Sequence, residues 1–419
     1  MQNKKMLLIL ISCITIIICL INFIIIPCYN KYNEIEKIKN AIINVTLKED
    51  TKVTFNTEVK VSELIESING NIIDDIPLRT NEVGKERITF EYINEENIKI
   101  PYTIEYEVVD KTPPVVWLSS SYSVTVGASP DFYKNIMCGD DLDDTPTCVI
   151  EGNYNLNVAG SYPVTFRATD YSGNTTTIPF TLYVKKPYTP KPSTPTTPSV
   201  PTTPQPENRT YIEDIITNYK TEKTKIGIDV SRYQGDIDFA AVKAAGVEFA
   251  ILRVGGTTGI YGEYFLDKKF KEYIKGFNDI GIPVGVYFFS YSPSKESSIR
   301  DAEWVLEQIK DYKVELPIVY DWENWSFYNE FKLSFNNLTK NAVAFMDTVK
   351  QKGYEGMLYS SKNYLQKIWL KVDYPIWIAH YTKDKSISYE QYDYWQICEN
   401  GKVNGINANV DIDIMYIKE

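Results

Sequence analysis

The stretch PIVYDWENW, residues 317 to 325, reads as a buried strand that ends in two carboxylates. Side chains alternate between the faces of a strand, so Asp321 and Glu323 share one face and Trp322 lies on the other. The Cα atoms of the two acids are then roughly 6.6 Å apart. On a solvated surface strand such a pair would have no chemical role, so the surrounding sequence decides its meaning.

Strand-like runs alternate with helical segments from about residue 222 onward. The runs are KIGIDV (225–230), EFAILRV (248–254), PVGVYFFS (283–290), LPIVYDWE (316–323), GMLYSS (356–361), PIWIAHY (375–381), DYWQIC (393–398) and NVDIDIMY (409–416). Helical patterns such as residues 294–309 and 337–353 separate the first five runs, whereas the last three runs lie close together. This order predicts a modified TIM-like (β/α)5β3 barrel over residues 222–419.

Acidic residues stand where the predicted strands end. Asp229 closes the first strand, Asp321 and Glu323 close the fourth, and Asp411 lies on the last. Active sites of such barrels form at the C-terminal ends of the strands. Several like charges on one rim cost free energy unless a proton or a ligand resolves them, so these four acids are candidate catalytic residues.

Aromatic residues make up 13% of the chain, and six of the seven tryptophans lie beyond residue 300. The candidates for stacking against a sugar are Tyr287, Phe289, Tyr359, Trp377 and Tyr381. A role in the core is an equally good explanation for each of them. His380 and Cys398 allow a second hypothesis, cysteine catalysis, although a cysteine at the end of an apolar strand is usually a small buried hydrophobe.

Seven motifs in the C-terminal half resemble, in order and spacing, those of the glycoside hydrolase family 25 lysozymes. They are GIDVSRYQGDIDFAAVKAAGVEFAILRVGG, GIPVGVYFFSYS, LPIVYDWEN, GYEGMLYSS, YPIWIAHY, YDYWQI and NVDIDIMY. The resemblance implies an eight-stranded barrel with five helices. It also implies an N-acetylmuramidase that cuts between N-acetylmuramic acid and N-acetylglucosamine in peptidoglycan.

By the same resemblance Glu323 is the catalytic glutamate, and Asp321, Asp229 and Asp411 are the other site acids. We expect Glu323 to act as acid and then base, and Asp321 to stay ionised. Asp321 would then orient the substrate's own N-acetyl group or attack as a nucleophile, and we favour the first route. The chain departs from the family pattern at Trp322, where a shorter aliphatic residue is common, and at Asp413, where asparagine is common.

The N-terminus contains an uncharged run from Met6 to Pro27, which as a helix would span about 33 Å. Lys4 and Lys5 precede it, so we expect residues 1–28 to form a plasma-membrane anchor with its N-terminus inside and the remaining domains outside, in the cell wall of a bacterium. A cleaved secretory signal is the alternative, and lipidation at Cys28 a third.

The middle of the chain contains short strand-like runs and an internal repeat. Residues 82–108 align with residues 158–184, which predicts two all-β sandwiches at 29–109 and 110–185. The second copy resembles bacterial immunoglobulin-like domains. Cys138 and Cys148 are a tentative disulfide. The acids Asp140, Asp141, Asp143 and Asp144 fit a solvated turn better than a calcium loop.

The Pro/Thr-rich residues 186–221 predict a linker before the barrel. A net charge of −11 and a pI near 5.0 argue against a nucleic-acid partner, and a single histidine excludes a multi-histidine metal site. We expect no cofactor and no metal. The sequence thus predicts a membrane-anchored, wall-remodelling lysozyme whose partners are peptidoglycan strands and the membrane; it names no protein partner. The alternatives are a glycan-binding surface protein and another glycan hydrolase on the same barrel.

Overall fold

The computed structural model describes residues 18, 20–118, 120–132, 136–187, 209–323, 328–382 and 391–418. The chain divides into two compact units, Met1–Lys111 and Thr112–Glu419. Most of the uncharged run 6–27 lies outside the described residues, which begin with η1 (Ile21–Ile25) and α2 (Ile26–Asn40). Within the described part of the chain, no helix combines the length and the apolar character needed to cross a bilayer.

The two predicted β domains share one strand order, although their sequences have diverged. In the first, the four-stranded sheet runs β2-β6-β5-β4, and in the second it runs β8-β12-β11-β10. The first sheet comprises β2 (Lys52–Thr54), β4 (Gly70–Ile72), β5 (Gly84–Asn94) and β6 (Lys99–Val109). The second comprises β8 (Ser121–Thr125), β10 (Thr147–Glu151), β11 (Gly160–Thr169) and β12 (Thr175–Lys185). The repeat seen in the sequence is therefore a repeat of the long antiparallel hairpins β5–β6 and β11–β12.

Each four-stranded sheet is accompanied by a pair of short antiparallel strands. In the first domain these are β1 (Val45–Leu47) and β3 (Ile65–Ile68), and in the second β7 (Val115–Trp117) and β9 (Met137–Gly139). Phe166, Phe180 and Leu182 on one face of the β11–β12 hairpin are buried, with Val116 and Ile136 in the same core. The all-β part of the fold prediction is confirmed, and the immunoglobulin-like relationship stays a prediction.

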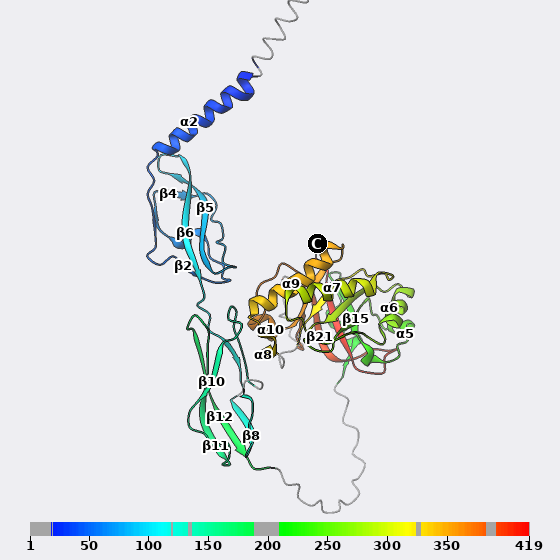
Figure 1. Cartoon of the computed structure of the whole chain (residues 1–419). Coiled ribbons are helices and arrows are strands. Elements are labelled where there is room, and N and C mark those ends of the chain that lie inside the picture. Colours follow the sequence, from blue (N-terminus) through cyan, green and yellow to red (C-terminus); the bar gives the residue numbers. More distant parts are fainter. Residues whose placement is uncertain are drawn as a thin grey trace, which may run out of the picture. The chain divides into compact units, whose positions relative to one another are not determined.

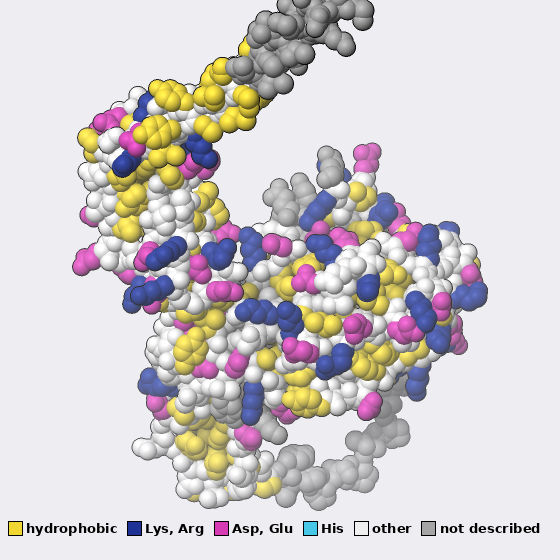
Figure 2. Space-filling model, turned by 45° about the horizontal axis from the view of Figure 1, so that its top comes forward, with side chains coloured by type: hydrophobic (Ala, Val, Ile, Leu, Met, Phe, Trp, Pro, Cys, Tyr) yellow, Lys and Arg dark blue, Asp and Glu magenta, His cyan; other side chains and the backbone are white. Residues whose placement is uncertain are grey.

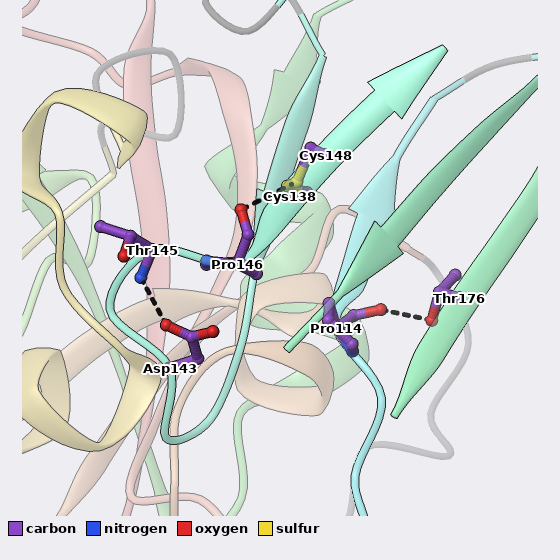
Figure 3. Close-up of a disulfide and its surroundings, with 7 residues drawn as sticks. All are labelled: Pro114, Cys138, Asp143, Thr145, Pro146, Cys148 and Thr176. Carbon is purple, nitrogen blue, oxygen red and sulfur yellow. Dashed lines mark hydrogen bonds between the residues drawn. A yellow bond between two sulfur atoms is a disulfide. The ribbon is translucent and has the colours of Figure 1, made fainter. Parts of the chain in front are cut away.

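Cys138 and Cys148 form a disulfide that joins β9 to β10 (Figure 3), with Cα atoms 6.8 Å apart. In the same region the Thr145 amide donates to the Asp143 carboxylate at 2.8 Å. The solvated turn predicted for the four aspartates is wrong for two of them, because Asp140 and Asp141 are buried. Asp140 accepts hydrogen bonds from two following amides and so shapes the turn from within.

The barrel forms as predicted from the alternating strands and helices (Figure 1). Its eight strands are β14 (Thr224–Val230), β15 (Phe249–Thr257), β17 (Val284–Phe289), β18 (Ile318–Asp321), β19 (Gly356–Ser361), β20 (Ile376–Ala379), β21 (Tyr394–Lys402) and β22 (Val410–Tyr416). The first seven are parallel, and β22 closes the barrel by pairing antiparallel with both β14 and β21. A short strand β16 (Tyr264–Leu266) pairs with the end of β15.

Helices follow each of the first five barrel strands. They are α5 (Phe239–Ala244), α6 (Phe270–Asp279), α7 (Lys295–Ile309), α8 (Tyr328–Phe331) with α9 (Phe335–Gln351), and α10 (Lys362–Lys367). Serine caps begin two of the longer ones: Ser294 accepts from the Ser297 amide and Ser334 from the Asn337 amide. On α7, Ala302, Val305 and Ile309 lie at helical spacing and are buried against the barrel.

The predicted boundary between linker and barrel is wrong. Before β14, the strand β13 (Thr210–Tyr211) pairs with β21, and α4 (Ile212–Tyr219) buries Ile212 and Ile215 in the core that surrounds the barrel. Residues 188–208, which hold most of the Pro/Thr-rich segment, lie outside the described residues. On the face shown in Figure 2, acidic and basic side chains are interspersed over the barrel.

Candidate active site

A pocket of about 340 Å³ opens at the C-terminal ends of the barrel strands. All nine predicted site residues line it: Asp229, Tyr287, Phe289, Asp321, Glu323, Tyr359, Trp377, Tyr381 and Asp411. Six further residues complete the wall, namely Ser231, Tyr233, Gln234, Arg253, Gln396 and Glu399. Sequence analysis did not single out these six, although five of them, all but Glu399, lie within the motifs that carry the family resemblance.

Strand register explains why distant residues meet in this pocket. Phe289, Asp321, Tyr359 and Trp377 are successive partners on β17, β18, β19 and β20, so they form one layer around the barrel. On the other side, Asp229 of β14 is the direct partner of Asp411 on β22. The antiparallel last strand therefore presents its acid at the same rim as the parallel strands.

Alternation along β18 explains why PIVYDWENW ends in two carboxylates that flank a tryptophan. Trp322 is fully buried on the outer side of the barrel, where its ring packs against Tyr364 and Trp369. Asp321 and Glu323 point to the inner side and line the pocket. The tryptophan thus anchors the end of the strand, and the two acids are presented to the pocket as a consequence.

The two acids of this pair differ in their surroundings. Asp321 is only 3% exposed, and its Oδ1 atom has no hydrogen-bond partner among the described residues. Burial, followed by the charge of Glu323, raises the pKa of Asp321 well above its usual range. Glu323 keeps solvent contact at the mouth of the pocket, and desolvation by the protein around its carboxyl raises its pKa as well.

We expected Asp321 to remain ionised, and its surroundings in the unliganded pocket favour the protonated form instead. The hydrogen bond between the two acids acts in opposite directions, raising the pKa of Asp321 and lowering that of Glu323. The two carboxyl groups are therefore coupled, and their titration belongs to the pair rather than to either residue.

Three further carboxyl groups lie together beneath the pair. Asp229 is 5% exposed, and burial followed by the charge of Asp413 raises its pKa well above the usual range. Burial and the neighbouring Asp229 raise the pKa of Asp411 to about 9. Asp413 does not lie on the rim where its sequence position suggested, because its side chain is completely buried. It accepts a hydrogen bond from the Trp377 indole at 2.9 Å. Burial is the main cause that raises the pKa of Asp413 well above its usual range.

Gln396 connects this acid cluster to the aromatic wall. Its amide nitrogen donates to Asp229 at 2.8 Å, and its oxygen accepts from the hydroxyls of Tyr359 and Tyr381 at 2.9 and 3.0 Å. Each of these three hydrogen bonds therefore joins Gln396 to another residue that lines the pocket. Arg253 forms an ion pair with Asp267 at 2.6 Å, and its positive charge also offsets part of the rise in the pKa of Asp321.

Residues 228–406 match the family model Glycosyl hydrolases family 25. This part of the chain is a family 25 domain. A similar curated protein is the autolytic lysozyme of Clostridium acetobutylicum, 27% identical over 189 residues that make up 45% of this chain and 54% of that protein. Lysozyme M1 of Streptomyces globisporus is 24% identical over 212 residues, 44% of this chain and 65% of that protein. The chain spans about half the length of the first of these relatives.

Solved structures similar to the chain include the modular autolysin LytC from Streptococcus pneumoniae in complex with a synthetic peptidoglycan ligand. It is 30% identical, with a TM-score of 0.42, covering 47% of this chain and 48% of that one. A second is a family 25 glycosyl hydrolase from Bacillus anthracis, 24% identical with a TM-score of 0.41, covering 48% of this chain and 94% of that one.

The five predicted aromatic residues of the family 25 domain fall into two groups. The side chains of Trp377 and Tyr359 are 2% and 7% exposed and belong to the packed interior of the barrel. Each therefore forms part of the pocket floor and part of the core. Tyr287 and Phe289 are half-buried, and Tyr381 is 50% exposed. These three are therefore the rings of the set with the most surface left for a sugar.

The cysteine hypothesis finds no support in the family 25 domain. Cys398 is buried, and burial raises the pKa of its thiol to about 11, the opposite of what a nucleophilic cysteine requires. It also lines a different pocket from the one that holds the acids. His380 lies closest to Lys362, with its Nε2 atom 3.3 Å from the lysine Nζ.

Proposed function

We propose that this protein is a lysozyme that hydrolyses the β-1,4 bond between N-acetylmuramic acid and N-acetylglucosamine in peptidoglycan. The observation that carries the proposal is the convergence of Asp229, Asp321, Glu323 and Asp411 in one aromatic-walled pocket of a family 25 domain. Two curated relatives of this domain are named as lysozymes, which supports the choice of substrate.

Glu323 is the general acid in this proposal. It stands at the solvent-facing edge of the pocket, where a leaving sugar can receive its proton and a water molecule can later be activated. Its raised pKa keeps a proton available closer to neutral pH than an ordinary glutamate would. For the acid step, the pair must carry its shared proton on Glu323.

Asp321 orients the substrate's N-acetyl group. Its Oδ1 atom is buried and has no partner among the described residues, so an N–H donor from the substrate would satisfy it. That hydrogen bond favours the ionised form of Asp321 and thereby moves the shared proton to Glu323. The N-acetyl oxygen, held by this contact, attacks the anomeric carbon as the bond to the leaving oxygen breaks. We favour this route over direct attack by Asp321 because its buried Oδ1 atom, without a partner among the described residues, offers an acceptor for the N-acetyl N–H group.

Asp229 and Asp411 provide hydrogen bonds at the cleavage point. Both carry raised pKa values, so they enter the reaction mainly as neutral carboxyl groups that donate as well as accept. The Gln396 amide holds Asp229 in position by a hydrogen bond. The hydroxyls of Tyr359 and Tyr381 bond to the same Gln396 side chain, which positions the aromatic wall that faces the sugar. The site therefore does not need to accommodate several full negative charges.

The cellular setting belongs to the same proposal and rests on the sequence. The uncharged run 6–27 behind Lys4 and Lys5 supports a membrane anchor, with the β domains and the Pro/Thr-rich segment reaching outward into a bacterial wall. Local remodelling of that wall is the role we propose. Recovery of the chain from washed membranes, with its C-terminal domain open to protease on intact protoplasts, tests the topology; a protected C-terminal domain contradicts it.

The activity is tested with purified protein and its Glu323→Gln variant on peptidoglycan, followed by mass spectrometry of the reduced fragments. We expect fragments ending in reduced N-acetylmuramic acid from the wild type and none from the variant. The exposed Asp373→Asn serves as a control that changes a carboxyl outside the pocket. Fragments ending in N-acetylglucosamine would indicate another glycan hydrolase, and intact polymer with retained binding would favour the glycan-binding alternative.

A further inference from the structure

A second pocket of about 340 Å³ adjoins the acidic pocket on the far side of Glu323. The two share Glu323, Tyr359 and Tyr381, so the catalytic glutamate stands on the border between them. The remaining wall of the second pocket consists of Ser361, Lys362, Asn363, Tyr364, Ala379 and His380. A glycan chain cut at Glu323 must occupy space on both sides of that residue, which makes this pocket the continuation of the cleft.

The second pocket is less acidic than the first. Apart from the shared Glu323, its charged wall residue is Lys362, whose Nζ atom lies 3.3 Å from the His380 Nε2 atom. The ion pairs that lysines form across residues 209–323, 328–382 and 391–418 do not include Lys362. A lysine ammonium has three donors, so a contact with one imidazole nitrogen leaves two for a ligand.

The neighbours of Lys362 are held in place. The His380 amide donates to the Gln396 carbonyl at 3.1 Å, and the Trp395 indole donates to the His380 carbonyl at 2.8 Å. Lys362 itself is half-buried at the start of α10. The backbone of His380 is thus held by the barrel, and the lysine head lies beside its imidazole at the pocket wall.

We propose that Lys362 binds a carboxylate of the stem peptide carried by the peptidoglycan strand. This inference rests on the proposed function and extends it to the part of the substrate that is not sugar. The sugar rings of the strand offer hydroxyls and amides, for which an ammonium is not required. Carboxylates enter the polymer through the free lactyl group, or through the peptide where one is attached to it, and a half-buried lysine beside the His380 imidazole is suited to bind one.

The test compares wild type, Lys362→Gln and Lys362→Arg on three forms of one strand preparation. The first form carries stem peptides, the second has lost them and bears free lactyl carboxylates, and in the third those carboxylates are converted to neutral amides. For Lys362→Gln we expect KM on peptide-bearing strands to rise about three- to tenfold with kcat little changed, and KM on neutral strands to stay as in wild type. Lys362→Arg keeps the charge and should recover most of the loss.

Lys340→Gln is the matched control, because Lys340 is exposed on α9 and lies outside both pockets. A loss that extends to strands with free lactyl carboxylates and disappears on the amidated ones also supports carboxylate binding, and shows that Lys362 accepts the carboxylate of either group. Equal loss on all three forms, or no loss on any, overturns the proposal.

Equilibrium binding of the same strands to Glu323→Gln, with and without Lys362→Gln, gives a readout that does not depend on cleavage. A chain that cuts nothing but binds peptide-bearing strands more tightly through Lys362 would refute the hydrolase proposal and support this one. If Glu323→Gln binds peptide-bearing strands with the same affinity with and without Lys362→Gln, this inference is refuted, whether or not the wild type cleaves them.

Discussion

Replacing Asp413 with asparagine should make the barrel more stable than the wild type, and the difference should grow as the pH rises. Asp413 is completely buried beneath the acid cluster, its Oδ1 atom accepts from the Trp377 indole, and burial raises the pKa of its carboxyl well above the usual range. A neutral carboxylic acid resembles an amide in shape and in having both a donor and an acceptor. Asparagine can therefore keep the indole contact and the contact with Asp229.

The magnitude follows from proton linkage. In the unfolded chain the carboxyl ionises near pH 4, whereas burial in the folded barrel raises its pKa well above that value. Its contribution to stability is thus fully present below pH 4 and is lost as the pH rises, by about 1.4 kcal/mol per pH unit. Asparagine has no proton to release, so between pH 5 and 7 the free energy of unfolding of the variant should gain about 2.7 kcal/mol on the wild type.

Urea unfolding at pH 5, 6 and 7, followed by tryptophan fluorescence, measures this difference. Six of the seven tryptophans lie beyond residue 300, so the signal reports mainly on the barrel. The exposed Asp373→Asn is the matched control and should show no such slope. If the difference between Asp413→Asn and wild type is constant from pH 5 to 7, the carboxyl is ionised in the folded protein and the reasoning is wrong. Cleavage activity of the variant should be largely retained.

Three further predictions concern residues around the site and the disulfide. Trp322→Ala should cost about 3–5 kcal/mol of unfolding free energy, because the ring is completely buried against Tyr364 and Trp369; a loss below 1 kcal/mol in urea unfolding would show that the strand end is not anchored there. Gln396→Leu should lower kcat on the order of tenfold by releasing Asp229, with KM changing less; unchanged steady-state kinetics would remove Gln396 from the positioning role. Cys148→Ala should lower the stability of the second β domain by about 3 kcal/mol, measured by thermal unfolding of that domain, while strand cleavage by the barrel persists.

Much of the barrel could be predicted from the sequence because its signals are local. A strand shows its faces through alternation and a helix through its 3.6-residue period, so the eight strands, their order and the five helices followed from patterns within short windows. The same alternation placed Asp321 and Glu323 on one face, and the parallel arrangement then placed the strand ends on one rim. The region 209–221 was misread as linker because α4 is short and follows a proline-rich segment, and its burial becomes evident only when it packs on the barrel.

The sequence by itself determined which residues reach the rim, since periodicity and strand order are properties of the chain. Only the tertiary structure decided what those residues do there. Closure by the antiparallel β22 placed Asp411 opposite Asp229 and moved Asp413 into the interior, and Gln396 became a site residue through contacts with Asp229 on β14 and Tyr359 on β19. Proton affinity depends on burial and on charges contributed by the whole fold, which is why the pKa values of both Asp321 and Glu323 are raised in the pocket.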